Sequence, residues 1–286
     1  MKKKKSKNGS PKSPKDHLIE RVNMDRQSYE LAQKYLLGLP GISQQLVDKH
    51  IYYQQKMRPR TLNEVYKRFL ESAQNAGMRS VVIGKSIGGI DALSEVLCGF
   101  DPKDILKKYN DNWEKVLNTI IKDVKPSGKI RQTSRSLWPQ FSKTIISAAK
   151  FLAQFKNEMD FYRWINFFDK NALARPALPM LLSYEIEGFG FPLACDFVKE
   201  IGYTNFGKPD VHLKKIFSKL NLCKRVDDYD VFKAIVRVAD NAGVSPYTVD
   251  KLFWLIGSGY FYLDNIKVGR HADRFIEYVR ISGSII

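Results

Sequence analysis

Residues 181–198 read LLSYEIEGFGFPLACDFV, in which a Gly-x-Gly turn joins two apolar-rich segments of helical spacing. Glycine adopts positive backbone dihedrals at little cost, so Gly188 and Gly190 predict a tight turn with positive dihedrals at both positions. The two glycines also clear side chains from one face of the turn. We therefore expect the amides of Gly188, Gly190 and Leu193, with the positive end of the second helix, to form a seat for a phosphate group.

A single aspartate follows this turn at a fixed distance. Residues 207–213 read GKPDVHL, and Asp210 lies twenty positions after Gly190. Taken alone, Asp210 is a good helix N-cap, because an aspartate there accepts amide hydrogens of the first turn. The spacing instead predicts a carboxylate beside the phosphate seat. Lys208 and Lys214 could contact a polyanion by charge, although a solvated helix face explains Lys214 equally well.

These motifs resemble those of the helix-hairpin-helix DNA glycosylase (HhH-GPD) superfamily, which has an endonuclease III-like fold. In that family a Leu-Pro-Gly-Val-Gly hairpin is followed, at the same distance, by a Val-Asp-x-His loop that carries the catalytic aspartate. The sequences FSKTIISAAK at 141–150 and LFWLIG at 252–257 are similar to two further family helices. The resemblance covers about residues 60–260. It implies that Asp210 is catalytic, that His212 is structural, and that residues 188–190, including Phe189, contact DNA.

Two departures from the family pattern indicate which branch of the family this chain resembles. Members that also nick the strand carry a nucleophilic lysine two residues after the second hairpin glycine, where this chain has Pro192. Many relatives hold an iron–sulfur cluster with four cysteines near the C-terminus, but no cysteine follows Cys223 here. We therefore expect a monofunctional enzyme with no cofactor and no metal. Glu187, in place of the usual proline, adds a negative charge that weakens the phosphate seat.

The net charge supports a polyanionic partner. The 286 residues contain 47 Lys and Arg against 30 Asp and Glu, a net charge of +17. Seven of the lysines lie in residues 1–15, which contain no acid, so the rest of the chain is also basic. Such a balance favours a nucleic acid over other partners. Double-stranded DNA with a damaged or mispaired base is the expected partner.

The pattern of apolar residues is helical almost throughout and predicts an all-α fold with two helical lobes. We expect a disordered basic tail at 1–15, an N-terminal helical extension at 16–60 and a glycosylase-like domain at 61–286. The predicted helices span residues 26–37, 44–55, 61–76, 78–98, 102–109, 112–123, 138–155, 160–169, 176–186, 192–201, 211–220, 229–242, 246–256 and 270–280.

Three further residue sets are candidates with alternatives. Gly84-Lys85-Ser86 lacks the earlier glycine of a nucleotide-binding loop; Lys85 and Ser86 could instead belong to a loop that fills the gap left by an extruded base, or to a helix junction. Trp138 and Tyr260 are candidates for stacking on that base, although most aromatic residues will be core. Three scattered cysteines, four histidines and no long apolar run predict no disulfide, no metal site and no membrane segment.

The expected function is thus a monofunctional DNA glycosylase, acting as a monomer, cytoplasmic and nucleoid-associated in a prokaryote or nuclear in a eukaryote. Two alternatives remain open at this point. One is a non-catalytic helix-hairpin-helix DNA-binding protein, and the other a bifunctional glycosylase–lyase that uses a displaced lysine, with Lys208 the nearest. The excised base is not decided by the sequence; alkylated purines are a mild preference.

Overall fold

Short polar side chains set where most of the helices begin. In the computed structural model, which describes residues 13–52, 58–75 and 82–282, these side chains accept hydrogen bonds from amides of the first turn, as N-cap residues do. The residues are Ser13, Ser43, Thr61, Asp101, Asn112, Asn157, Asp210, Asp227 and Ser245. Left-handed Gly243 and Gly259 end two of the later helices.

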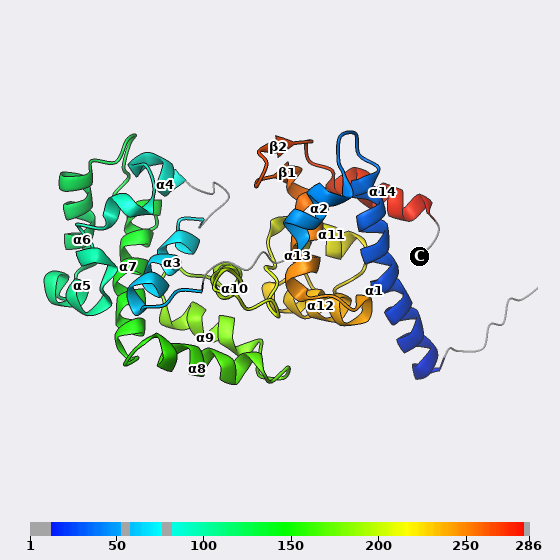
Figure 1. Cartoon of the computed structure of the whole chain (residues 1–286), viewed down its shortest axis with the longest axis horizontal. Coiled ribbons are helices and arrows are strands. Elements are labelled where there is room, and N and C mark those ends of the chain that lie inside the picture. Colours follow the sequence, from blue (N-terminus) through cyan, green and yellow to red (C-terminus); the bar gives the residue numbers. More distant parts are fainter. Residues whose placement is uncertain (1–12, 53–57, 76–81, 283–286) are drawn as a thin grey trace, which may run out of the picture.

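The described chain is predominantly helical, so the predicted all-α class is confirmed (Figure 1). The helices are α1 Pro14–Leu37, α2 Gln44–Ile51, α3 Leu62–Ala73, α4 Val82–Ile87, α5 Pro102–Tyr109, α6 Trp113–Thr119, α7 Leu137–Ala153, α8 Glu158–Asp169, α9 Ala177–Glu185, α10 Phe191–Glu200, α11 Val211–Lys219, α12 Asp228–Ala242, α13 Pro246–Ser258 and α14 Ala272–Ile281. Within the described ranges, no helix has the length and apolar composition needed to cross a membrane.

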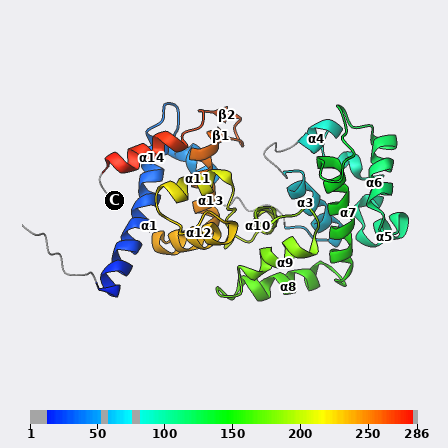
Figure 2. The ribbon, with the colours of Figure 1, turned by 180° about the vertical axis from the view of Figure 1, so that it is seen from behind.

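Two hydrophobic cores divide the helices into two lobes. The first core, in the first lobe, is built mainly from residues 65–206. The second core, in the second lobe, is built from residues 29–51 and 213–279. Figure 1 shows α3 to α9 gathered at one end and α1, α2 and α11 to α14 at the other, with α10 between them, and the reverse view in Figure 2 agrees. The second lobe therefore combines the two ends of the described chain.

The N-terminal segment is part of the second lobe, which corrects the predicted extension at 16–60. Leu36 of α1 and Ile51 of α2 are fully buried in the same core as the C-terminal helices. Asp25 of α1 is also fully buried and forms two hydrogen bonds with Arg237 of α12, at 2.7 and 3.0 Å. A boundary at residue 60 would thus separate helices that need one another for burial.

Several local predictions differ from the structure. The helix predicted at 78–98 ends at Ile87, because Gly88 and Gly89 have positive φ angles. Two 3₁₀ turns, Ile90–Leu93 and Cys98–Phe100, follow, and residues 78–81 of this prediction lie outside the described residues. The first helix starts at Pro14 rather than near 26, so the end of the predicted disordered tail is helical. Residues 1–12 lie outside the described residues. A two-stranded hairpin, β1 Tyr260–Phe261 with β2 Ile266–Lys267, was not predicted.

The contact between the lobes runs through the start of α10. Phe191, the first residue of α10, packs edge-on against Phe232 of α12 with ring centroids 5.6 Å apart. Phe206, in the segment between α10 and α11, also packs on Phe232 at 6.1 Å. The Tyr247 amide of α13 donates to the Thr204 carbonyl at 3.0 Å. The Gly-x-Gly turn, which immediately precedes α10, therefore lies where the two lobes meet.

The Asp25–Arg237 pair provides a test of the role of α1. Replacing Asp25 by Ala removes the buried acceptor of hydrogen bonds from Arg237 and Asn241, and we expect the free energy of unfolding to fall by about 2 kcal/mol. Denaturant titration of the wild type and of Asp25→Ala measures this change. Lys107→Ala, which removes an exposed ion pair with Asp104, is the matched control and should unfold like the wild type. Equal stability of the two variants would contradict the assignment.

Candidate functional site

A large open cleft lies at the junction of the lobes. Its volume is about 1740 Å³, and its walls come from α3 and α4 on one side and from α10, α11, α13 and the β hairpin on the other. Gly188, Gly190, Lys208, Lys214 and Asp210 all line it, although they come from separate segments of the chain. The turn and the aspartate that the sequence paired are therefore brought to one cleft.

Helix α7 fixes the Gly-x-Gly turn in place. The Thr144 hydroxyl donates to the Glu187 carbonyl at 2.6 Å, and the Glu187 amide donates to the Ser147 hydroxyl at 3.0 Å. Gly188 has φ of +73°, and a Cβ there would lie 3.0 Å from the Thr144 Oγ1 atom. The positive dihedral predicted at Gly188 is thus confirmed, and the close contact with α7 requires glycine as well.

Gly190 differs from the prediction. Its φ is −66° and its ψ 166°, an extended conformation open to any residue, so the expected positive dihedral is wrong at this position. A Cβ on Gly190 would meet only the Cδ atom of Pro192, at 3.9 Å. Because Gly190 lines the cleft, its missing side chain leaves the turn open on the cleft side.

The amides of the turn are only partly available. The Leu193 amide donates to the Gly190 carbonyl at 2.9 Å, so it is not the free donor that the sequence predicted. The Phe189 amide is also occupied, by the Ile186 carbonyl at 3.2 Å. The Phe189 side chain is 1% exposed and packs on Phe69 in the first core, which also removes it from the DNA-contacting set. The Gly188 and Gly190 amides donate to no other described residue and remain available to a ligand.

The loop that carries Asp210 packs closely against the second lobe. A Cβ on Gly207 would lie 2.5 Å from the Ile235 side chain and 3.0 Å from the Pro246 carbonyl, so only glycine fits there. Asp210 then caps α11, since its Oδ1 atom accepts the amides of His212 at 2.9 Å and Leu213 at 3.1 Å. The capping expected from the sequence is confirmed, and in addition the carboxylate lines the cleft.

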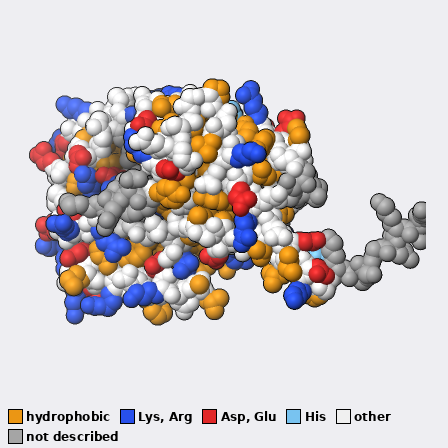
Figure 3. Space-filling view, turned by 45° about the vertical axis from the view of Figure 1, so that its right-hand side comes forward, with side chains coloured by type: hydrophobic (Ala, Val, Ile, Leu, Met, Phe, Trp, Pro, Cys, Tyr) orange, Lys and Arg blue, Asp and Glu red, His pale blue; other side chains and the backbone are white. Residues whose placement is uncertain are grey.

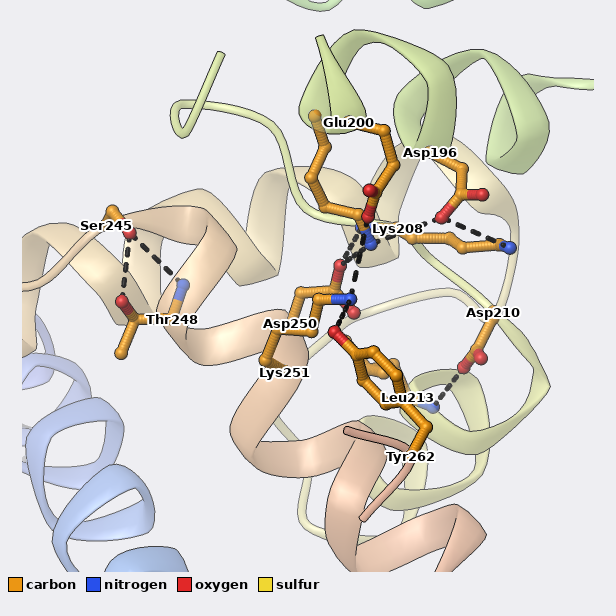
Figure 4. A network of polar contacts seen from close by, with 11 residues as sticks. Asp196, Glu200, Lys208, Asp210, Leu213, Ser245, Thr248, Asp250, Lys251 and Tyr262 are labelled. Atoms are coloured by element: carbon orange, nitrogen blue, oxygen red, sulfur yellow. Dashed lines mark hydrogen bonds and ion pairs between the residues drawn. The ribbon is translucent and has the colours of Figure 1, made fainter. Parts of the chain in front are cut away.

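Asp210 belongs to a group of charged residues on the cleft floor (Figure 4). Burial raises the pKa of the Asp210 carboxyl, and the negative charge of Asp250 raises it further, against the opposing effects of the Leu213 amide and the nearby His212 and Lys208. Burial lowers the pKa of His212, which favours its neutral form. Asp210 is therefore a more basic carboxylate than a solvent-exposed aspartate.

A buried lysine lies among these carboxylates and was not singled out in the sequence. Lys199 of α10 is 3% exposed, and its ammonium lies 2.7 Å from Asp250 and 3.2 Å from Asp196. Burial would lower the pKa of Lys199, but the two carboxylates outweigh burial and raise it. For Asp196, Lys208 and Lys199 likewise outweigh burial and lower the pKa. Lys199 and Asp196 are therefore charged near neutral pH.

The predicted basic residues lie at the cleft but differ in whether they are paired with a carboxylate. Lys208 lies 3.5 Å from Asp196, and Lys214 is paired with Asp228. Lys85 of α4 is exposed at the opposite wall, beside Gly88 and Gly89. Ser86 is not a wall residue: its hydroxyl donates to the Ile83 carbonyl at 2.7 Å, within α4, so its assignment to DNA contact is not supported.

The two predicted base-stacking residues lie in different environments. Trp138 of α7 is 6% exposed and packs edge-on against Phe141 in the first core, so its assignment to a base pocket is wrong. Tyr260 does line the cleft. Trp254 and Tyr262, which pack against one another at 5.8 Å, line it too. Their spacing in the sequence gave no indication of a shared surface, because α13 and the hairpin bring them together.

His212 has a structural environment. A Cβ on Gly257 would lie 2.5 Å from the His212 Cβ atom, so the glycine of the LFWLIG stretch lets α13 approach α11 at this point. Among the described residues, no group of three or more His, Cys, Asp or Glu side chains is arranged to hold a metal ion. Cys98, Cys195 and Cys223 are free thiols.

The two glycines of the turn should respond differently to alanine. Gly188→Ala forces a Cβ into a left-handed conformation and against Thr144, and we expect a loss of about 1–2 kcal/mol in the free energy of unfolding. Gly190→Ala should be neutral or slightly stabilising, because an extended alanine meets no strain and lowers the entropy of the unfolded chain. Denaturant titration of both variants tests the difference, and an equal loss would contradict the described turn.

Comparison with known proteins gives no relative from which to transfer a role. The chain matches no family model, no curated protein and no solved structure among those compared. The chemistry of the cleft is therefore the basis for assigning a function.

Proposed function

We propose that this protein is a monofunctional DNA glycosylase with Asp210 as its catalytic carboxylate and an endonuclease III-like fold. The observation that carries the proposal is that Asp210 and the open Gly188–Gly190 turn line one cleft between two helical lobes. Double-stranded DNA with a damaged or mispaired base is the proposed ligand, bound by a monomer. Repair of DNA damage by base excision is the corresponding role.

Asp210 suits the electrostatics of glycosidic bond cleavage. Breaking an N-glycosidic bond develops positive charge on the sugar ring, which a fixed carboxylate near C1′ stabilises. The Oδ1 atom of Asp210 is held by two amides of α11, so the group cannot rotate freely. The Oδ2 atom accepts no hydrogen bond from the described residues, which leaves it available to the sugar or to an attacking water. Its raised pKa also makes it a better base.

The turn and the basic wall suit a DNA backbone. The Gly188 and Gly190 amides can donate to a phosphate without a charged side chain, and such contacts position a protein without reading sequence. Lys208, Lys214 and Lys85 line the same cleft. On the face shown in Figure 3, Lys and Arg side chains are distributed over the body among acidic ones, so the lysines of the cleft and the turn amides, rather than a broad basic face, support the proposal.

The side chains near the turn favour attack by water. Pro192, at the position of the lyase nucleophile, lines the cleft and carries no amine. Lys199 is buried between two carboxylates that keep it protonated, and a protonated amine is not a nucleophile. Lys208 is the observation that favours a second candidate, a glycosylase–lyase, because it lines the cleft two residues before Asp210. Its ammonium is paired with Asp196 at 3.5 Å, however, and this contact stabilises the protonated form. A non-catalytic DNA-binding protein is the remaining alternative.

A side chain on Gly190 should block the phosphate seat without harming the fold. We expect Gly190→Val to remain folded, because the backbone is extended there and nothing lies closer than Pro192. Its affinity for duplex DNA should fall, measured by fluorescence anisotropy at two salt concentrations. Pro192→Ala, which leaves both turn glycines unchanged, is the control. Wild-type affinity in a folded Gly190→Val protein would show that the turn has only a structural role.

Removing the charge of Asp210 tests the chemistry. Asp210→Asn should bind DNA like the wild type but excise the base about a hundredfold more slowly or worse, as expected when a transition-state electrostatic partner is lost. Asparagine is an equally good N-cap. A raised pKa means that folding disfavours the ionised carboxyl, so above that pKa the neutral Asn removes a cost, and the thermal midpoint should stay equal or rise.

The excision assay uses a panel of duplexes that each carry one altered base, with Asp273→Asn, at an exposed carboxylate of the same lobe, as control. Excision by the wild type should leave the strand intact, and borohydride should trap no covalent complex. Trapping that disappears in Lys208→Gln would establish the lyase. Binding with no excision on any duplex would leave the non-catalytic alternative, and full activity in Asp210→Asn would remove the catalytic assignment.

A further inference from the structure

Asp250 of α13 connects the buried lysine to the loop that carries Asp210. It is 2% exposed, although it borders the cleft. Its Oδ2 atom accepts two hydrogen bonds, from the Lys199 ammonium at 2.7 Å and from the Lys208 backbone amide at 3.0 Å. Figure 4 shows Asp250 close to Lys208 and Lys251, with Asp210 to its right. A buried carboxylate is retained only where such partners compensate for its loss of hydration.

The bond to Lys208 fixes the loop two residues before Asp210. The Asp210 amide in turn donates to the Lys208 carbonyl at 2.9 Å, so one short path of hydrogen bonds runs from α13 to the capping residue. Gly207, at the start of the loop, lies so close to α13 that a Cβ there would be 3.4 Å from the Asp250 Cβ atom. The loop therefore takes its position from Asp250 at one end and from the cap of α11 at the other.

Lys199 keeps Asp250 available for this task. Its ammonium lies between Asp250 and Asp196 and pairs with both. The three side chains are only 2–14% exposed, so little solvent reaches these ion pairs. The Lys208 side chain completes the cluster through Asp196. Two lysines and two aspartates thus balance one another. Asp210, which forms no ion pair with the described residues, adds a further negative charge at the cleft floor.

We infer that Asp250 is a positioning residue for Asp210: its carboxylate holds the Lys208 amide and so aims the Asp210 carboxylate into the cleft, while Lys199 holds Asp250 in place. This inference rests on the proposed function for its effect on catalysis, but its structural content is independent of it. Asp250 also acts on Asp210 through charge, because its negative charge raises the pKa of the Asp210 carboxyl. The titratable groups whose charge acts on Asp210 are Asp250, Lys208 and His212. Burial, Arg270 and Lys215 lower the pKa of His212, while Asp210 raises it.

Two substitutions separate position from charge. Asp250→Ala removes the acceptor of the Lys208 amide, and we expect the excision rate at saturating DNA to fall by about tenfold to a hundredfold, the scale of a small misplacement of a catalytic group, with DNA affinity unchanged. Asp250→Asn keeps an oxygen for that amide and removes the charge. It should recover part of the rate, and the acid limb of its pH–rate profile should move to lower pH, because the pKa of Asp210 falls when the negative neighbour is lost.

Measurements by NMR make the test independent of any enzymatic activity. In the wild type, the Lys208 amide should exchange slowly with solvent, and carboxyl ¹³C titration should show a lower pKa for Asp210 in Asp250→Asn than in the wild type. The double variant Lys199→Met/Asp250→Ala removes both charges together. It replaces Asp250→Ala in the test if the single variants do not fold. Asp273→Ala is the control and should match the wild type.

The outcomes distinguish the two proposals. If no duplex is excised by the wild type but the Lys208 amide is protected and the Asp210 pKa falls in Asp250→Asn, the proposed function fails and the positioning role stands. If the wild type excises a base but Asp250→Ala, or the double variant in its place, does so at the wild-type rate, the positioning role is wrong. Rapid exchange of the Lys208 amide or an unmoved Asp210 pKa overturns it as well.

Discussion

The buried ammonium of Lys199 is the interaction on which the cleft depends. It lies between Asp196 of its own helix α10 and Asp250 of α13, at 3.2 and 2.7 Å. An ion removed from water loses several kcal/mol of hydration, so such a group persists only with well-placed partners. Because the partners lie on two helices, the pair ties α10, which continues from the Gly-x-Gly turn, to α13, which holds the Asp210 loop. The Gly-x-Gly turn and the Asp210 carboxylate are thereby held in one frame.

The apolar contact at the same junction has a different role. Phe232 of α12 packs on Phe191 and Phe206 and belongs to the first core, although its helix belongs to the second lobe. Such a contact holds the lobes together over an area but allows small shifts, since hydrophobic attraction has no preferred direction. The hydrogen bonds through Asp250 are directional and specify geometry. The junction therefore joins the lobes by packing and orients the Asp210 carboxylate by polar contacts.

The parts of the site that could be predicted are those governed by local backbone chemistry. A positive φ at Gly188 and an N-cap at Asp210 follow from a few neighbouring residues, and both are present in the structure. Phe189 and Trp138 could not be placed, because an aromatic residue has the same sequence signature in a core as beside a ligand. Lys199 was missed for a similar reason: its partners lie three and fifty-one residues away, and only the packing of α13 on α10 reveals the second.

Asp210 shows why a motif and a structure carry different information. As an N-cap, it needs only one oxygen and two amides, and an asparagine or a serine would do as well. The structure adds what capping does not require: a neighbouring buried carboxylate, Asp250, whose charge opposes the ionisation of Asp210, and a free Oδ2 atom at an open cleft. A cap optimised for stability would avoid a second negative charge nearby. Carboxyl groups with a raised pKa in a cleft are often found at functional sites, so this environment supports the role proposed for Asp210.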